Sequence, residues 1–136
     1  MNLLVNIDVA DLDVAIHFYT HAFDLKVGRK FGLDGAELVG GSAPIYLLVK
    51  APGSRASTES DQLRSYKRHW SPVHLDIVVN DIDASIERAV RAGATLEQAV
   101  RSNRWGKLAL LADPFGHGFC FVQFVGRGYD EITTSQ

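Results

Sequence analysis

Apolar and polar positions follow the same order twice along the chain, at a constant separation of 70 residues. Residues 7–16 and 77–86 share Ile, Val, Asp, Asp and Ile at equivalent places. An internal repeat defines an architecture more firmly than local propensity does. The sequence therefore predicts two copies of one structural unit.

Each copy opens with an apolar, β-branched run, at 3–9 and at 73–79, which predicts a strand. An aspartate then stands in the position of a helix N-cap, Asp11 in the first copy and Asp81 in the second. Apolar residues recur at helical spacing after both, and Gly93 can end the second helix with a positive φ. A helix is expected after each aspartate.

Three strand-like runs follow each helix, so that each unit has the order strand, helix, then three strands. They cover residues 25–27, 36–39, 45–49, 95–100, 107–111 and 119–124. The expected organisation is a first module at 1–50, a polar linker or flap at 51–70, a second module at 71–125 and a C-terminal tail at 126–136, together forming one domain.

Composition narrows the class of protein. With 136 residues, 46% of them hydrophobic and 22% charged, the chain is of ordinary globular type. A net charge of -2 lacks the basic excess that phosphate neutralisation requires, so no nucleic-acid partner is expected. No apolar run reaches the roughly 20 residues of a membrane span, and the N-terminus lacks the pattern of a signal peptide, so we expect a cytoplasmic protein without membrane contact.

Several of these features together resemble the vicinal oxygen chelate superfamily, the group of glyoxalases, bleomycin resistance proteins and extradiol dioxygenases. They are the doubled unit, the pair Phe18-Tyr19 in the first helix, the sequence His74-Leu75-Asp76, and the Asp-Pro-Phe-Gly-His turn at 113–117. The resemblance implies an α+β fold of two tandem βαβββ modules whose curved mixed sheets surround one cavity. It also implies a small organic ligand and a homodimer.

Enzymes of this superfamily hold a divalent metal with ligands from the first and last strands of both modules. His74 matches one such position, but Leu4 occupies the equivalent place in the first module, because 74 − 70 = 4. Tyr46 and Cys120 stand at the two last-strand positions, where carboxylates are usual. No metal ligand is therefore assigned, and the resemblance leaves a divalent metal open only at a degraded site.

Strand alternation, combined with the resemblance, predicts a polar strip in the cavity made by Asn6, Asp8, His74 and Asp76. We expect His74 and Asp76 to act as acid–base groups. The expected substrate-binding residues are Asn6, Asp8, Tyr46, Trp70, Trp105 and Cys120. The competing interpretation is that the polar groups satisfy one another in a closed core and that the aromatic rings and the thiol only pack there.

Two functions agree with this pattern. The first is a glyoxalase-like lyase, isomerase or dioxygenase-type protein with a degraded metal site. The second is a non-catalytic protein that binds a small molecule or an antibiotic, as bleomycin resistance proteins do.

Overall fold

The computed structural model describes residues 1–135 and begins with a module of one helix and four strands. Its elements are β1 (Val5–Val9), α1 (Leu12–Ala22), β2 (Lys26–Lys30), β3 (Gly35–Val39) and β4 (Ile45–Val49). The sheet has the order β1-β4-β3-β2, in which β1 and β4 run parallel and the other pairs antiparallel.

The second module repeats this arrangement. It comprises β5 (Leu75–Val78), α2 (Ile82–Ala92), β6 (Thr95–Asn103), β7 (Gly106–Ala112) and β8 (Gly118–Phe124), in the sheet order β5-β8-β7-β6. The predicted α+β fold of two tandem βαβββ modules is thus confirmed. Strand β6 is longer than the sequence indicated, because it forms a hairpin with β7 that continues to Asn103.

The helix ends follow from the expected capping residues. The Asp11 carboxylate accepts a hydrogen bond from the backbone N–H of Val14 at 3.0 Å, and the Asp81 carboxylate accepts one from Ala84 at 3.1 Å. Gly93 ends α2 with φ of 126°, which a residue without a side chain adopts at little cost.

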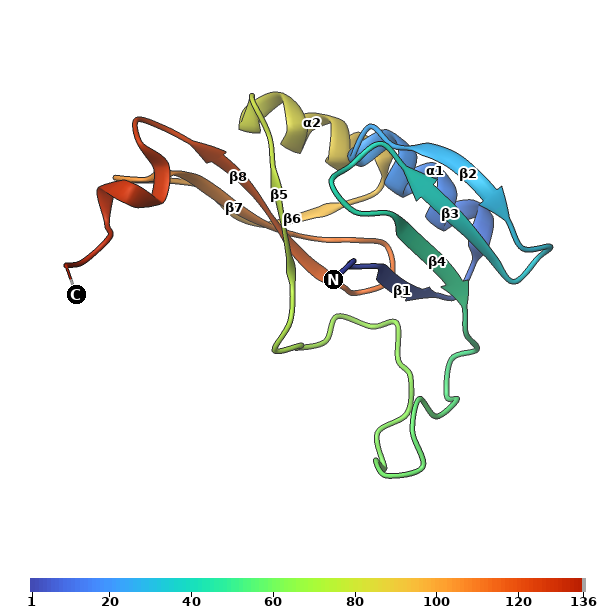
Figure 1. Ribbon diagram of the computed structural model, residues 1–136. Helices are drawn as coiled ribbons and strands as arrows, with labels where there is room; N and C mark the ends of the chain where they lie inside the picture. The colour runs from blue at the N-terminus through green and yellow to red at the C-terminus, as the bar shows by residue number, and fades with distance from the viewer. Residues whose placement is uncertain (136) are drawn as a thin grey trace.

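The two helices pack against each other and cover one face of both sheets (Figure 1). Phe18 of α1 is fully buried and contacts Phe119 of β8 edge to face, so the core is shared between the modules. Strand alternation places the remaining side chains on the opposite face of each sheet, which carries no helix and which we call the open face.

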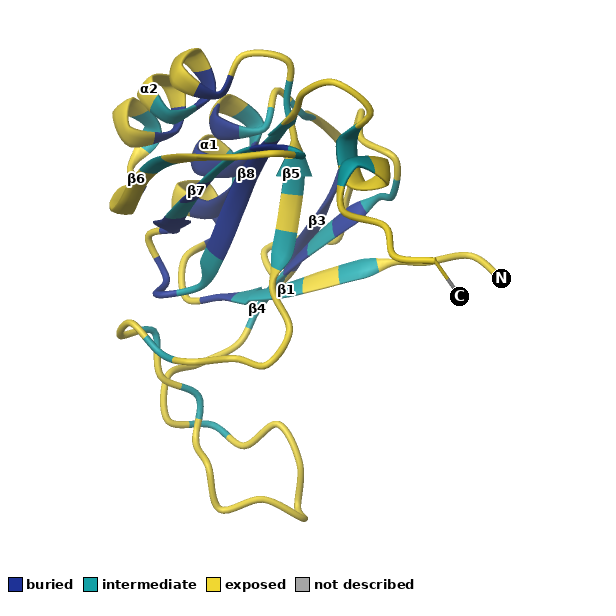
Figure 2. Ribbon diagram, turned by 90° about the vertical axis from the view of Figure 1, so that its left-hand side faces the viewer, coloured by how far each residue is buried: buried dark blue, intermediate teal, exposed yellow. Residues whose placement is uncertain are grey.

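The segment between β4 and β5 forms an exposed loop that extends below the two sheets (Figure 2). Several contacts fasten its second half to the body, among them the following three. Arg64 pairs with Asp8 of β1 at 2.8 Å, and Arg68 pairs with Glu97 of β6 at 2.7 Å. The Tyr66 hydroxyl donates to the Lys50 carbonyl at 2.6 Å. The polar linker of the sequence is therefore anchored at several points rather than loose along its whole length.

The tail forms a short 3-10 helix, η1 (Gly128–Glu131), that returns to the second module. The Tyr129 ring lies 5.2 Å from that of Trp105 and 4.8 Å from that of Phe124, measured between ring centroids. Among the described residues, no helix is long and apolar enough to cross a membrane.

Candidate functional site

Three reactive side chains meet on the open face of the second module. Asp76 of β5 lies directly opposite Cys120 of β8, and His74 precedes Asp76 by two residues on the same face. His74 Nε2 is 3.1 Å from Asp76 Oδ1, and one ligand atom from each of the three residues lies within 4.8 Å of the others. The side chains of His74 and Asp76 are 53% and 41% exposed, so a ligand can reach them.

The thiol of Cys120 is buried behind this pair. Burial and, to a smaller extent, the neighbouring Asp76 carboxylate together raise its pKa to about 11. The group is therefore a protonated thiol at neutral pH, and it lacks the thiolate character of a nucleophilic cysteine.

The first module carries a different polar group at the equivalent place. Asn6, Tyr46 and Glu37 stand side by side across β1, β4 and β3, where the second module has Asp76, Cys120 and Leu110. The buried Glu37 carboxylate accepts from the Tyr46 hydroxyl at 2.8 Å and from the Arg29 guanidinium at 2.6 and 3.1 Å.

These hydrogen bonds determine which form of Glu37 and of Tyr46 is favoured. Hydrogen bonds from Arg29 and Tyr46 lower the pKa of Glu37 to about 2, while the bond to Glu37 raises the pKa of Tyr46. A Cβ on Gly28 would lie 2.6 Å from Glu37 Oε1, so the glycine makes room for the carboxylate. The Tyr46 hydroxyl is therefore engaged in a hydrogen bond to Glu37, and the Glu37 carboxylate is engaged by Tyr46 and Arg29. The first module thus offers no free carboxylate at this position.

We expect the Glu37 carboxyl to have a pKa well below the ordinary value for glutamate. Because its folded pKa lies below the unfolded value, the charge stabilises the fold above about pH 4.3. This contribution disappears as the pH falls toward the folded value of about 2. Carboxyl ¹³C shifts measured against pH would show it, with Arg29→Ala raising the pKa more than Tyr46→Phe. A wild-type pKa near the ordinary value would contradict the network.

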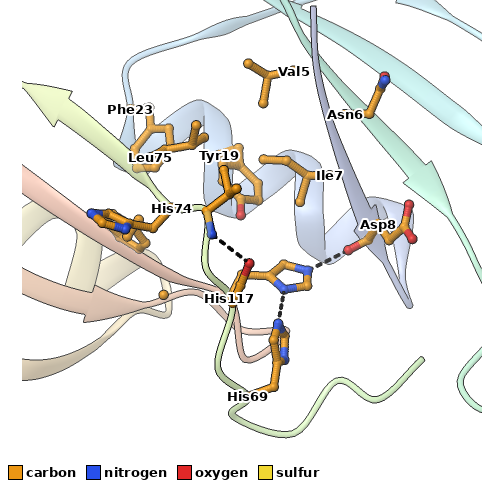
Figure 3. Close-up of a pocket in the computed structure, with 14 residues that line it drawn as sticks. Val5, Asn6, Ile7, Asp8, Tyr19, Phe23, His69, His74, Leu75 and His117 are labelled. Carbon is orange, nitrogen blue, oxygen red and sulfur yellow. Dashed lines mark hydrogen bonds between the residues drawn. The ribbon is translucent and has the colours of Figure 1, made fainter. Parts of the chain in front are cut away.

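A cleft of about 410 Å³ separates β1 from β5 (Figure 3). We call it the interstrand cleft. Its walls combine apolar side chains with several polar ones, as small-molecule sites do. The residues lining it are Val5, Asn6, Ile7, Asp8, Tyr19, Phe23, His69, Ser71, Val73, His74, Leu75, His117, Gly118 and Phe119.

A buried hydrogen bond joins the modules at this cleft. The Tyr19 hydroxyl of α1 donates to Oδ2 of Asp113, which begins the turn before β8. Oδ1 of Asp113 accepts from the backbone N–H groups of Phe115 and His117 at 2.8 and 2.9 Å. Burial, followed by the Asp113 carboxylate, raises the pKa of Tyr19 well above its ordinary value, so the donor stays protonated.

The expected polar strip is only partly assembled. His74 and Asp76 are in contact, as their spacing predicted, but Asp8 is held by Arg64 of the linker. The side chains of Asn6 and His74 point away from each other in Figure 3, although both residues line the interstrand cleft. Within one chain the two modules therefore present separate polar groups rather than one continuous strip.

The two tryptophans lie in unlike places. Trp70 is 84% exposed and lines a second hollow, the linker cleft, together with Asp8, Arg64 and His117. Trp105 packs on Phe124 and Tyr129 at the β6–β7 hairpin and lines neither of these two clefts.

Sequence reasoning missed the roles of Arg64 and Glu37. Arg64 is a charged residue within a polar linker, and Glu37 is a single acidic residue within an apolar strand. Neither pattern identifies the residue that will pair with it.

Comparisons with known proteins agree with this architecture. A family model described as a glyoxalase-like domain matches residues 4–122. An uncharacterized protein of Mycobacterium bovis is 35% identical over 134 residues, which cover 91% of this chain and 84% of that protein.

Solved structures share the fold at low identity. FosX, a fosfomycin resistance protein of Listeria monocytogenes, is 15% identical with a TM-score of 0.69, and the likeness covers 98% of each chain. A glyoxalase/bleomycin resistance protein/dioxygenase family enzyme of Burkholderia phytofirmans is 22% identical with a TM-score of 0.68, over 90% of this chain and 97% of that one. Since the family model spans nearly the whole chain and the doubled fold agrees with it, the chain belongs to the glyoxalase-like family of the vicinal oxygen chelate superfamily.

Proposed function

We propose that the chain binds a small organic molecule in the interstrand cleft and exchanges a proton with it through His74. The observation that carries this proposal is the position of His74, which lines the interstrand cleft and is grouped with Asp76 and Cys120 of the open face, and two members of this group are open to solvent. The cleft volume of about 410 Å³ falls within the range of small-molecule sites.

The contact between His74 and Asp76 suits acid–base work. A carboxylate 3.1 Å from one ring nitrogen holds the imidazole in one orientation, as acid–base catalysis requires. Cys120 is a protonated thiol, so it contributes a small polarizable surface rather than a nucleophile, and it would bind a metal only with release of its proton.

The same three residues fit a divalent metal of borderline softness. Imidazole nitrogen, carboxylate oxygen and cysteine sulfur are the ligands that Zn²⁺ takes, and three protein ligands leave a position for a substrate. The thiol makes Mg²⁺ or Mn²⁺ a poorer match. When bound, such a metal would polarise a ligand oxygen. Asp76 supplies the third donor, which the ligand positions of the superfamily pattern do not include.

A non-catalytic binding protein is the second candidate. It is favoured by the first module, where Leu4 occupies the position equivalent to His74 in the repeat and the Tyr46 hydroxyl is hydrogen-bonded to Glu37. Antibiotics are one ligand class to consider, because similar folds include a fosfomycin resistance protein.

We also propose a homodimer, in which a second copy covers the open faces and exposed side chains such as Val78, which is 61% exposed. Light scattering should then give twice the chain mass.

Cobalt(II) titration tests the metal arm of the proposal. We expect a thiolate-to-cobalt absorption band in the wild-type protein, and we expect His74→Ala to weaken cobalt affinity by at least about 100-fold, because a first ligand is lost. His21→Ala is the matched control, since His21 is an exposed histidine of α1 remote from Cys120. Absence of the band and of binding would remove the metal arm.

Ligand binding tests the proton-transfer arm. Fosfomycin, bleomycin and a panel of small molecules with two adjacent oxygens would be added to metal-free and metal-loaded protein, and the His74 imidazole followed by NMR. Turnover of a bound compound that Asp76→Asn abolishes supports the enzyme. Binding without turnover supports the second candidate, and a panel that never perturbs His74 contradicts both.

A further inference from the structure

A pair of histidines fastens the linker to the rim of the interstrand cleft. His69 of the linker places Nε2 3.1 Å from Nδ1 of His117, in the turn before β8. The other nitrogen of His117, Nε2, lies 2.7 Å from the backbone carbonyl oxygen of Asp8, and His69 Nδ1 lies 2.9 Å from that of Lys67. Figure 3 shows the chain of contacts from His69 through His117 to Asp8.

The number of hydrogens that the two imidazole rings must carry on nitrogen follows from the acceptors they contact. A carbonyl oxygen only accepts, so His117 Nε2 and His69 Nδ1 must each carry a hydrogen. The contact between the two rings needs one more hydrogen, because two bare nitrogens would repel each other. Two neutral imidazoles carry only two hydrogens on their ring nitrogens, one on each ring. All three contacts are therefore satisfied only when the pair holds one extra proton and one positive charge.

We propose that the His69–His117 pair is a proton-dependent clasp that closes the linker over the rim of the interstrand cleft. When the pair loses its extra proton, one of the three contacts must break, and the end of the linker loosens. This inference concerns regulation of the site proposed above and rests on that function only for the identity of the ligand cleft.

The neighbouring charges are mostly paired with each other. Arg64 of the linker binds Asp8 of β1, and Arg68 binds Glu97 of β6. Asp113 of the turn is bonded to Tyr19 and to the backbone of His117. The remaining titratable groups that face the pair are Tyr66, whose ring lies 6.1 Å from that of His117, and His74, which lines the same cleft.

Charged groups of both signs surround the clasp. The carboxylates of Asp8 and Asp113 and the guanidinium groups of Arg64 and Arg68 lie around it, and no side-chain carboxylate bonds directly to either ring within the described residues.

The clasp also restrains the segment that carries His74. Only four residues, 70–73, separate His69 from His74, and all four are exposed. They have no place in a helix or strand, so the bond at His69 is the fixed end of the segment that carries His74. Release of the clasp should widen the rim and let His74 move.

Two NMR measurements on the full chain test the clasp without ligand or metal. Imidazole ¹H–¹⁵N correlations should show His117 protonated at Nε2 and the pair sharing one further proton at low pH. The protection factor of the His69 amide, which donates to the Gly116 carbonyl at 3.4 Å, should then fall roughly three- to tenfold as the pair loses that proton.

Variants separate the clasp from other histidines. His69→Gln should make the protection of the residue 69 amide independent of pH, whereas His21→Gln should keep the wild-type response, because His21 belongs to α1. A pair that is neutral while all its contacts persist would overturn the inference, as would loss of the proton without loss of protection. Either result would leave the cobalt and ligand tests of His74 untouched.

Discussion

Replacing Asp113 with alanine should lower the free energy of unfolding by about 3–5 kcal/mol, among the largest effects of any single change in the chain. The carboxylate is buried and accepts three hydrogen bonds, from the Tyr19 hydroxyl and from the backbone N–H groups of Phe115 and His117. Alanine would leave these three donors without an acceptor, and water cannot readily replace it in the interior.

Denaturant unfolding of both proteins, followed by circular dichroism, measures this loss. Asp61→Ala is the matched control, since the Asp61 side chain is fully exposed and makes only a 3.7 Å ion pair with Arg55. That change should stay within about 0.5 kcal/mol of the wild type. A loss below about 1 kcal/mol for Asp113→Ala would mean that the turn satisfies its donors in another way.

The same bond links the modules, which gives Tyr19 a distinct pH effect. Its folded pKa is raised, so its contribution to stability is complete below the unfolded value of about 10 and is lost as the pH rises further. The alkaline loss of Tyr19 and the acid loss of Glu37 thus lie at opposite ends of the pH scale.

Local pattern was sufficient for the elements of this fold. The 70-residue repeat, the apolar runs, the two aspartate caps and Gly93 predicted both helices and the order of the elements along the chain, because each depends on neighbours in the sequence. The pairing of His74 with Asp76 was predictable for the same reason, since residues two apart in a strand share a face.

Contacts between distant segments decided the rest of the candidate site. Asp8 has the alternation of a cavity residue, yet Arg64, 56 residues later, binds it and ties it to the linker. The position of Asn6 relative to His74 depends on how the helices of the two modules pack. No periodicity within one module contains that information.

The linker illustrates the limit most clearly. Its composition predicted a connection or a flap, and nothing in it indicated which of its residues would bind the body. The partners lie on β1, on β6 and in the turn before β8, so the anchored conformation depends on the finished fold.

A single methyl group at Gly116 should detach this linker. Gly116 has φ of 79°, and a Cβ built there would lie 2.3 Å from the Lys67 carbonyl oxygen and 2.9 Å from the Arg68 backbone nitrogen. Backbone atoms cannot yield as a side-chain end can, so the segment around His69 must move away. We expect Gly116→Ala to lower the free energy of unfolding by about 2–4 kcal/mol, from backbone strain plus the steric conflict.

Gly53 provides the control that separates these two causes. It has the same φ of 79°, but a Cβ there would meet nothing within 4 Å. Gly53→Ala should therefore cost only the strain of about 1–2 kcal/mol. Denaturant unfolding gives both losses, and tryptic cleavage after Lys67 and Arg68 reports release of the linker, which should accelerate in Gly116→Ala alone. Equal losses and equal cleavage in the two variants would show that the turn before β8 does not hold the linker, because only the Gly116 variant disturbs that contact.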